Sequence, residues 1–117
     1  MKYMMLIYQD EQVLSEGERQ ACYAESAQFA QQLHKDGHFI AANPLQSVAT
    51  ATSVRLRDGK PLLLDGPFAE TREQLGGYFL VEAKDLDEAI RIAAGIPAIK
   101  WGTVEIRPVV EVAGVPE

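Results

Sequence analysis

Cysteine, histidine and basic residues are scarce in this sequence, and each shortage narrows the class of protein it can encode. The 117 residues include one cysteine, Cys22, which excludes an internal disulfide and any cysteine-rich zinc site. Eleven lysines and arginines stand against 17 acidic residues, which gives a net charge of −6. That charge repels phosphate backbones and no basic cluster offsets it, so we expect no nucleic-acid partner.

Long apolar runs are also missing. The first apolar run, residues 3–8, is too short for the apolar region of a signal peptide or for a membrane span. We therefore expect a cytoplasmic protein that does not bind membranes. Repeats and linkers are missing too, and the length fits one domain. We assign residues 1–112 to that domain and residues 113–117 to a C-terminal tail.

Apolar residues in strand-like runs predict six strands. We place these strands at residues 2–9, 39–42, 53–57, 60–64, 78–83 and 103–110. The third and fourth runs are joined by Asp58-Gly59, a pair that favours a type I′ hairpin turn. Pro61 has no N–H to donate to a neighbouring strand, so we expect this hairpin at a sheet edge.

Two helices lie between the strands. Ser15 and Glu18 form a capping box that begins the first helix, and Gly37 is free to take the left-handed conformation that ends it. Asp85 begins the second helix, again with a glutamate three residues on, and Gly95 helps to end it. The predicted buried faces are Cys22, Phe29, Ala30 and Leu33 in the first helix, and Leu86, Ala89, Ile90 and Ala93 in the second.

The element order β-α-β, hairpin, β-α-β predicts an α+β fold of the ferredoxin-like type with an extra β-hairpin. Both helices of that fold cover one face of an antiparallel sheet. Leu6, Tyr8, Leu80 and Ile106 cannot all be placed under only two helices, so some apolar strand surface remains on the other face. An apolar patch of that size marks an interface, so the pattern predicts a two-fold homodimer with the sheets facing each other.

The segment from Asp65 to Gly77, which begins Asp-Gly-Pro-Phe, resembles the DGPF signature of the YCII-related family. The resemblance runs from Met1 to Pro108 and implies a ferredoxin-like domain that pairs into a dimeric α+β barrel. In another branch of the family it implies a His–Asp dyad on the first helix. The matching positions here, counted back from the end of that helix, hold Ser26 and Lys35, so dyad chemistry is not carried over.

Asp65 and Phe68 each have two readings. Asp65 ends a strand, where a carboxylate can serve as a general base or hydrogen-bond acceptor. Asp before Gly-Pro also fixes turns by accepting backbone N–H bonds, and we favour that structural role. Phe68 is either a ring that stacks on a ligand or an apolar anchor of the loop in the core, and the anchor is preferred.

A charged run follows in the same segment. Arg72 can bind a carboxylate or phosphate through two parallel hydrogen bonds. The alternative is a solvated helical turn that includes Glu70, Arg72 and Glu73, with Thr71 and Gln74 at capping-box spacing. We prefer the helical turn and keep Arg72 and Glu73 as candidate ligand contacts.

Nucleotide and metal sites lack support. Gly76-Gly77 has neither the G-x-G-x-x-G pattern nor a Walker lysine, so we expect the pair to allow positive φ or a close backbone approach. His34 and His38 are the only histidines, and no paired carboxylate motif accompanies them. His34 lies near the end of the first helix, where the helix dipole favours a cationic side chain. His38, at the start of a strand, is the better candidate for a site. We expect no metal and no cofactor.

Tyr78, Arg107 and Trp101 are further candidates for the cavity between two facing sheets or for its rim. Trp101 lies between the second helix and the last strand, where it can equally cover the core. Arg107 shares a strand face with Glu105, so an Arg–Glu pair across the barrel is as good an explanation as ligand binding.

Two functions remain open. The first is a small-molecule site in the barrel cleft near the signature loop, with cofactor-independent enzymatic chemistry by analogy to other barrels of this fold. Asp65 would be base or acceptor, His38 an acid or base, and Phe68, Arg72, Glu73, Tyr78 and Arg107 ligand contacts. The second is a non-catalytic binding or regulatory module, because the resemblance points to proteins linked to sigma factors.

Overall fold

A four-stranded antiparallel sheet in the order β2-β5-β1-β6 forms the centre of the fold. The structure, a computed structural model, describes residues 1–116, and Glu117 at the end of the predicted tail lies outside the described residues. The strands of the sheet are β1 (Lys2–Gln9), β2 (Phe39–Pro44), β5 (Gln74–Glu82) and β6 (Gly102–Pro108). With the helices below, this is the predicted ferredoxin-like α+β arrangement.

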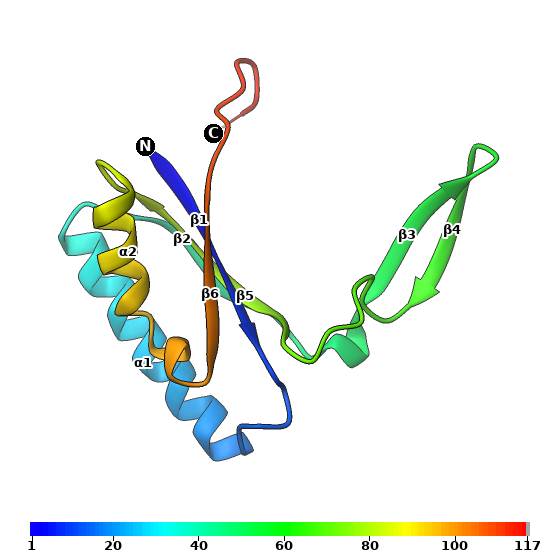
Figure 1. The fold of residues 1–117 in the computed structure, drawn as a ribbon, viewed down its shortest axis with the longest axis horizontal. Helices are drawn as coiled ribbons and strands as arrows, with labels where there is room; N and C mark the ends of the chain where they lie inside the picture. The colour runs from blue at the N-terminus through cyan, green and yellow to red at the C-terminus, as the bar shows by residue number, and fades with distance from the viewer. Residues whose placement is uncertain (117) are drawn as a thin grey trace.

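Helices α1 (Glu16–Lys35) and α2 (Leu86–Ala94) lie on the same side of this sheet (Figure 1). The predicted capping box of α1 is confirmed: the Ser15 hydroxyl accepts from the Glu18 N–H at 3.2 Å, and the Glu18 carboxylate accepts from the Ser15 N–H at 3.0 Å. Gly37 has φ +81° beyond the helix end. Neither helix within residues 1–116 is long and apolar enough to cross a membrane.

The core lies between the helices and the sheet. Met5, Val81 and Ile96 are fully buried in it. The predicted face of α1 is confirmed, but that of α2 needs a correction: Leu86 is 52% and Ile90 49% exposed. The buried residues of α2 are Ala89, Ile92 and Ala93, whose i, i+3, i+4 spacing turns a different stripe toward the sheet.

The sheet face opposite the helices, called the open face below, carries Met4, Leu6 and Tyr8 of β1. These half-buried residues alternate with the buried Tyr3, Met5 and Ile7. Leu80 of β5 is the partner of Met4 and therefore shares the open face. Ile106 does not, so it is the one of the four apolar strand residues that lies under the helices.

Ile106 lies opposite the fully buried Met5 in the β1–β6 register. Partners in an antiparallel pair share a face, so Ile106 packs against the core under the helices. Glu105 and Arg107 are the β6 residues on the open face.

Strands β3 (Thr52–Arg57) and β4 (Lys60–Asp65) form the predicted hairpin, but it is a separate two-stranded sheet and not an edge of the main one. It stands away from the sheet on the side opposite the helices (Figure 1). The base of the hairpin is closed internally, because the Gly66 N–H donates to the Ala51 carbonyl at 2.8 Å. The radius of gyration, 15.9 Å, exceeds the roughly 13 Å of a compact chain of this length, which reflects the projecting hairpin.

Two further differences concern the segment after the hairpin. No helical turn forms around Glu70, and residues 66–73 make an irregular connection. Strand β5 begins at Gln74, so Gly76 and Gly77 lie inside it with ordinary negative φ. The β1–β5 register shifts between Ile7 and Tyr8, which leaves Gly76 as the extra residue of a bulge.

Candidate functional site

A pocket of about 220 Å³ lies between α1 and the sheet and is called the helix–sheet pocket. Most of its wall is apolar and comes from α1 and strands β1, β2 and β5. The apolar lining residues include Ile7, Ala27, Ala30, Phe39, Ala42 and Phe79. A dry cavity of about 150 Å³ holds benzene in an engineered protein, so this volume suits a single-ring molecule.

A small number of polar side chains interrupt that apolar wall. Tyr23 and Ser26 reach it from α1, and Gln9 reaches it from the end of β1. The Gln9 Oε1 atom is buried and has no hydrogen-bond partner among residues 1–116. A buried amide oxygen without a donor costs about 1–3 kcal/mol, and native proteins leave such atoms unpaired at few places. A ligand with an N–H or O–H group would supply the missing donor.

The glycine pair at the start of β5 shapes the wall of the pocket. A β-carbon on Gly77 would lie 3.0 Å from the Asn43 carbonyl oxygen and 3.2 Å from Pro44 Cα, both backbone atoms of β2. The predicted close backbone approach is therefore confirmed at Gly77. Of the two alternatives for the pair, positive φ is the one that the structure does not use.

A more polar hollow of about 580 Å³, called the outer pocket, continues from the helix–sheet pocket and shares Gln9, Tyr23 and Gly76 with it. Glu11, Glu16 and Arg19 supply its charges. The Arg19 guanidinium donates to the Glu11 carbonyl oxygen at 3.2 Å, and its Nε lies 3.6 Å from a Glu16 carboxylate oxygen. The ionic groups of the site thus stand at its outer end.

The helix–sheet pocket itself holds no carboxylate, histidine, lysine or arginine among its lining residues within positions 1–116. Cys22 lies in its wall, and burial raises the pKa of this thiol, so it stays protonated at neutral pH. Tyr23 and Ser26 contribute hydroxyl groups that can donate or accept hydrogen bonds. The pocket is therefore equipped to hold a neutral ring by hydrogen bonds and apolar contact.

A third hollow, of about 520 Å³, lies between the signature loop and the open face and is called the loop pocket. Phe68 lines it from the loop, and Tyr8 and Leu75 line it from the sheet. Phe68 is 75% exposed, so it does not anchor the loop in the core as preferred from the sequence. The Arg55 guanidinium carbon lies 5.8 Å from its ring centroid. The hairpin stands clear of the sheet, which leaves Phe68 no core to enter.

Asp65 ends β4 at the base of the hairpin and is exposed. Its carboxylate makes no hydrogen bond within residues 1–116, so the favoured turn-fixing role is not seen. Backbone and hydroxyl groups close the turn in its place: the Ser53 hydroxyl donates to the Gly66 carbonyl oxygen at 2.8 Å, and Gly66 adopts φ +98°.

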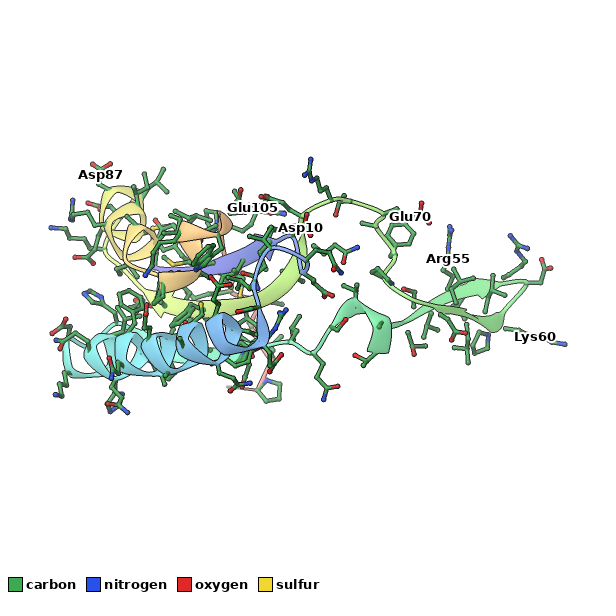
Figure 2. All side chains as sticks on the ribbon, turned by 90° about the horizontal axis from the view of Figure 1, so that it is seen from below. Asp10, Arg55, Lys60, Glu70, Asp87 and Glu105 are labelled. Atoms are coloured by element: carbon green, nitrogen blue, oxygen red, sulfur yellow. The ribbon has the colours of Figure 1, made fainter. Side chains whose placement is uncertain are left out.

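Near the start of β5, Arg72 contacts an acidic side chain and Glu73 contacts a hydroxyl group. Arg72 Nε lies 3.5 Å from an Asp10 carboxylate oxygen, although the arginine side chain is 91% exposed. Glu73 accepts a hydrogen bond from the Thr103 hydroxyl at 2.9 Å. These contacts tie the loop to the ends of β1 and β6. Figure 2 shows Asp10 beside the sheet and Glu70 out on the connection to the hairpin.

His38 lies at the other end of the sheet. Its Nδ1 donates to the Glu82 carbonyl at 2.8 Å and stands 3.9 Å from a Glu88 carboxylate oxygen. Strand β5 separates Glu82 from Gln74, where the signature loop ends, by roughly 26 Å at about 3.3 Å per residue. The structure therefore does not bring His38 together with Asp65.

Tyr78 and Arg107 come from the sheet. Tyr78 lies opposite Leu6 on the open face, and its hydroxyl accepts from the Asn43 amide at 3.0 Å. Arg107 is exposed and lies 4.0 Å from Glu105 of the same strand, so this pair is formed along β6. No group of three or more His, Cys, Asp or Glu residues that could hold a metal occurs in the part of the chain described.

Sequence reasoning missed Gln9 and Tyr23. Gln9 does carry a signal, because it is the one amide at the end of an otherwise apolar strand. Tyr23 follows Cys22 on the helix and lies outside the face predicted to be buried. Ser26, the position where the family resemblance would place a histidine, lines the same pocket.

Comparisons with known proteins give a consistent assignment. A family model described as the YCII-related domain matches residues 1–113. An uncharacterized protein of Rhizobium meliloti (strain 1021) is 31% identical over 113 residues, which cover 92% of this chain and 91% of that protein. A solved structure is also similar: 5-chloro-2-hydroxyhydroquinone dehydrochlorinase (TftG) from Burkholderia phenoliruptrix AC1100, in complex with 2,5-dihydroxybenzoquinone. It has a TM-score of 0.55 and 14% identity over 96% of both chains, which shows a shared fold.

Proposed function

The chain belongs to the YCII-related family, and on that premise we propose that it binds a small single-ring compound with hydroxyl or amine substituents in the helix–sheet pocket. The unpaired Gln9 Oε1 carries this proposal, because a buried acceptor at a pocket wall calls for a donor. The volume of about 220 Å³ supports a ring of six atoms with short substituents.

The chemistry of the wall supports the same ligand class. Phe39 and Phe79 offer apolar aromatic surface, and Tyr23 and Ser26 can donate or accept hydrogen bonds. TftG, whose fold is similar, was solved with 2,5-dihydroxybenzoquinone, a ring compound of this kind. That quinone is ionised at neutral pH and then offers no O–H group, so hydroquinone, a neutral ring with two hydroxyl groups, is the first probe to test on this protein.

Binding is measured by isothermal titration calorimetry of hydroquinone and of phenol against the wild-type protein. A single-ring ligand of this size should bind with a Kd between about 10 µM and 1 mM. Gln9→Met should weaken binding of the hydroxylated ligand by about tenfold, the value of one hydrogen bond to a buried acceptor. The matched control is Gln28→Met on the exposed side of α1, which should bind as the wild type does.

Failure of every single-ring probe to bind at millimolar concentration would contradict the proposal. Equal affinities for the wild type and Gln9→Met would remove the role given to Gln9 while leaving the pocket in place.

Cofactor-independent catalysis in this pocket is the second candidate. The observation in its favour is that a similarly folded protein, TftG, is named as a dehydrochlorinase. In this chain the carboxylates nearest the pocket are Glu11 and Glu16 of the outer pocket. Glu11 accepts hydrogen bonds from the Ser47 hydroxyl and the Val48 N–H, both at 2.8 Å. Glu16 has longer contacts, with the Gln20 amide at 3.0 Å and Arg19 Nε at 3.6 Å, so Glu16 is the candidate base. Turnover of a chlorinated hydroquinone that is lost in Glu16→Gln would support this role.

We also propose that two copies pair through the open face. Met4, Leu6, Tyr8 and Leu80 leave apolar strand surface there that no element within residues 1–116 covers. A sheet-to-sheet contact in a two-fold dimer would bury it. Sedimentation equilibrium of the wild type and of Leu6→Glu tests this: a dimer is expected for the first and a monomer for the second, and a monomeric wild type contradicts the pairing.

A further inference from the structure

The hairpin β3–β4 has one apolar face and one basic face. Cross-strand partners share a face, so the register places Val54 opposite Leu63 and Leu56 opposite Pro61 on the same side. Val54 is 62%, Leu56 75% and Leu63 65% exposed. These four residues, Val54, Leu56, Pro61 and Leu63, are called the apolar face of the hairpin.

Nothing within residues 1–116 supports this face. Strands β3 and β4 pair only with each other in the described chain. An isolated two-stranded hairpin is marginally stable in water, and three large apolar side chains on one side of it raise the cost of leaving it free. The hairpin therefore calls for a covering surface.

The position of the hairpin indicates where that surface is. Figure 1 shows the hairpin rising on the side of the sheet opposite α1 and α2, which is the side of the open face. The loop pocket lies at the angle between the two, with Tyr8 on the sheet and Phe68 at the base of the hairpin. A molecule seated on the open face would lie beside the hairpin.

The distribution of charge favours a second copy of this chain as the molecule seated on the open face. Residues 52–65 carry three basic and two acidic side chains, a net charge of +1, whereas the whole chain carries −6. The rest of the chain therefore carries −7. Figure 2 shows Arg55 and Lys60 on the hairpin, remote from both helices. A basic arm on an acidic body is attracted to the body of another copy.

We infer that the hairpin is an arm that clasps a second copy of this chain. The apolar face of the hairpin packs on the second copy, which occupies the open face. In a two-fold dimer the hairpin of the second copy makes the same contact with the first. The clasped copy also covers the loop pocket, so Phe68 and Asp65 meet the second copy and not bulk solvent. This inference rests on the proposed pairing through the open face and is independent of the ligand in the helix–sheet pocket.

Sedimentation equilibrium on the full chain tests the arm. The double variant Leu56→Glu/Leu63→Glu should raise the dimer Kd by about 100-fold or more, because it places charge where two leucines are buried. The control Leu86→Glu changes another exposed leucine, 52% exposed at the start of α2, and should leave the dimer Kd within twofold of the wild type. Unchanged dimerisation in the double variant would overturn the arm.

A second measurement guards against a misfolded hairpin. A photo-crosslinking benzoylphenylalanine at position 56, in a mixture of isotopically light and heavy protein, should give crosslinked peptides that join light to heavy chains. Crosslinks confined to one chain would show that the hairpin folds back on its own body and would overturn the inference. Calorimetry with hydroquinone on the double variant separates this outcome from a failure of the ligand proposal.

Discussion

Gly76 passes so close to Gln9 that a β-carbon on the glycine would lie 3.4 Å from the Gln9 amide nitrogen. The bulge in β5 creates this approach, because Gly76 is the residue left without a partner in β1. The absent side chain gives the Gln9 amide its place at the wall of the helix–sheet pocket, where its oxygen is buried and unpaired. The bulge thus builds the polar point on which the proposed ligand site depends.

Gln9→Met should stabilise the ligand-free protein while weakening ligand binding. The variant removes a buried oxygen that lacks a donor, and that oxygen costs about 1–3 kcal/mol. We expect the free energy of unfolding in urea to rise by about 1 kcal/mol, and the exposed control Gln28→Met to change it by less than about 0.5 kcal/mol. A loss of stability in Gln9→Met would mean that the amide is already satisfied in the free protein.

Gly77→Ala should destabilise the protein and Gly17→Ala should not. The new β-carbon at position 77 would meet backbone atoms of Asn43 and Pro44 at 3.0 and 3.2 Å, and backbone does not move aside cheaply. Thermal unfolding should show a loss of about 1–3 kcal/mol. At Gly17 in α1 nothing lies within 4 Å of the added atom, so the control should gain up to about 1 kcal/mol from helix propensity.

The capping box of α1 should make the free energy of unfolding depend on pH in the acid range. The hydrogen bond from the Ser15 N–H lowers the pKa of Glu18 from 4.5. A carboxyl whose pKa is lower in the folded state stabilises it above the unfolded pKa and loses that contribution as pH falls. The stability difference between the wild type and Glu18→Gln should therefore shrink as pH falls below about 4.5.

Urea titrations between pH 7 and pH 3 measure that difference, and Glu70→Gln in the loop controls for loss of one negative charge. A difference that stays constant down to pH 3 would rule out the contribution of the Glu18 carboxylate. Ser15→Ala should independently cost about 1 kcal/mol at neutral pH.

Cys22 should react slowly with thiol reagents and more slowly still when the pocket is filled. Burial raises the pKa of this thiol, and the thiolate is the reactive form. Reaction with Ellman's reagent at pH 8 should be at least about tenfold slower than in urea, and saturating hydroquinone should slow it further. Equal rates in the free and ligand-treated protein would place the ligand away from Cys22.

The sequence predicted the parts of the fold that local chemistry determines. Ser15 with Glu18, Gly37, and Asp58 with Gly59 each specify a cap, a stop or a turn through their own side chains or φ. They appear as predicted, and Asp58 and Gly59 have φ of +52° and +76°. The β-α-β pattern then selected the ferredoxin-like arrangement and the two-layer packing that leaves one sheet face open.

The errors arose where tertiary contacts decide. The sequence alone did not say which of Leu6, Tyr8, Leu80 and Ile106 lies under the helices, because a shift of one residue in register moves a side chain to the other face. The hairpin was placed at a sheet edge because Pro61 allows it there, yet β3 and β4 pair only with each other in the described chain. Because the hairpin stands apart from the sheet, Phe68 does not enter the core as expected.

The candidate site was harder to predict for a related reason. Gln9, Tyr23 and Ser26 belong to a strand and to one helix, and only the packing of α1 on the sheet brings them to one wall. Asp65, Arg72 and Glu73 were predicted as site residues because they lie in the signature loop, but the structure places them outside the helix–sheet pocket. The two ends of the predicted site, Asp65 and His38, lie at opposite ends of β5.

A crystal structure of the protein soaked with hydroquinone tests the central claim most directly. We predict ring density in the helix–sheet pocket, against Phe39 and Phe79, with a ligand hydroxyl within about 3 Å of Gln9 Oε1. Density for the ring on the open face or in the loop pocket, with the helix–sheet pocket empty, would contradict the account.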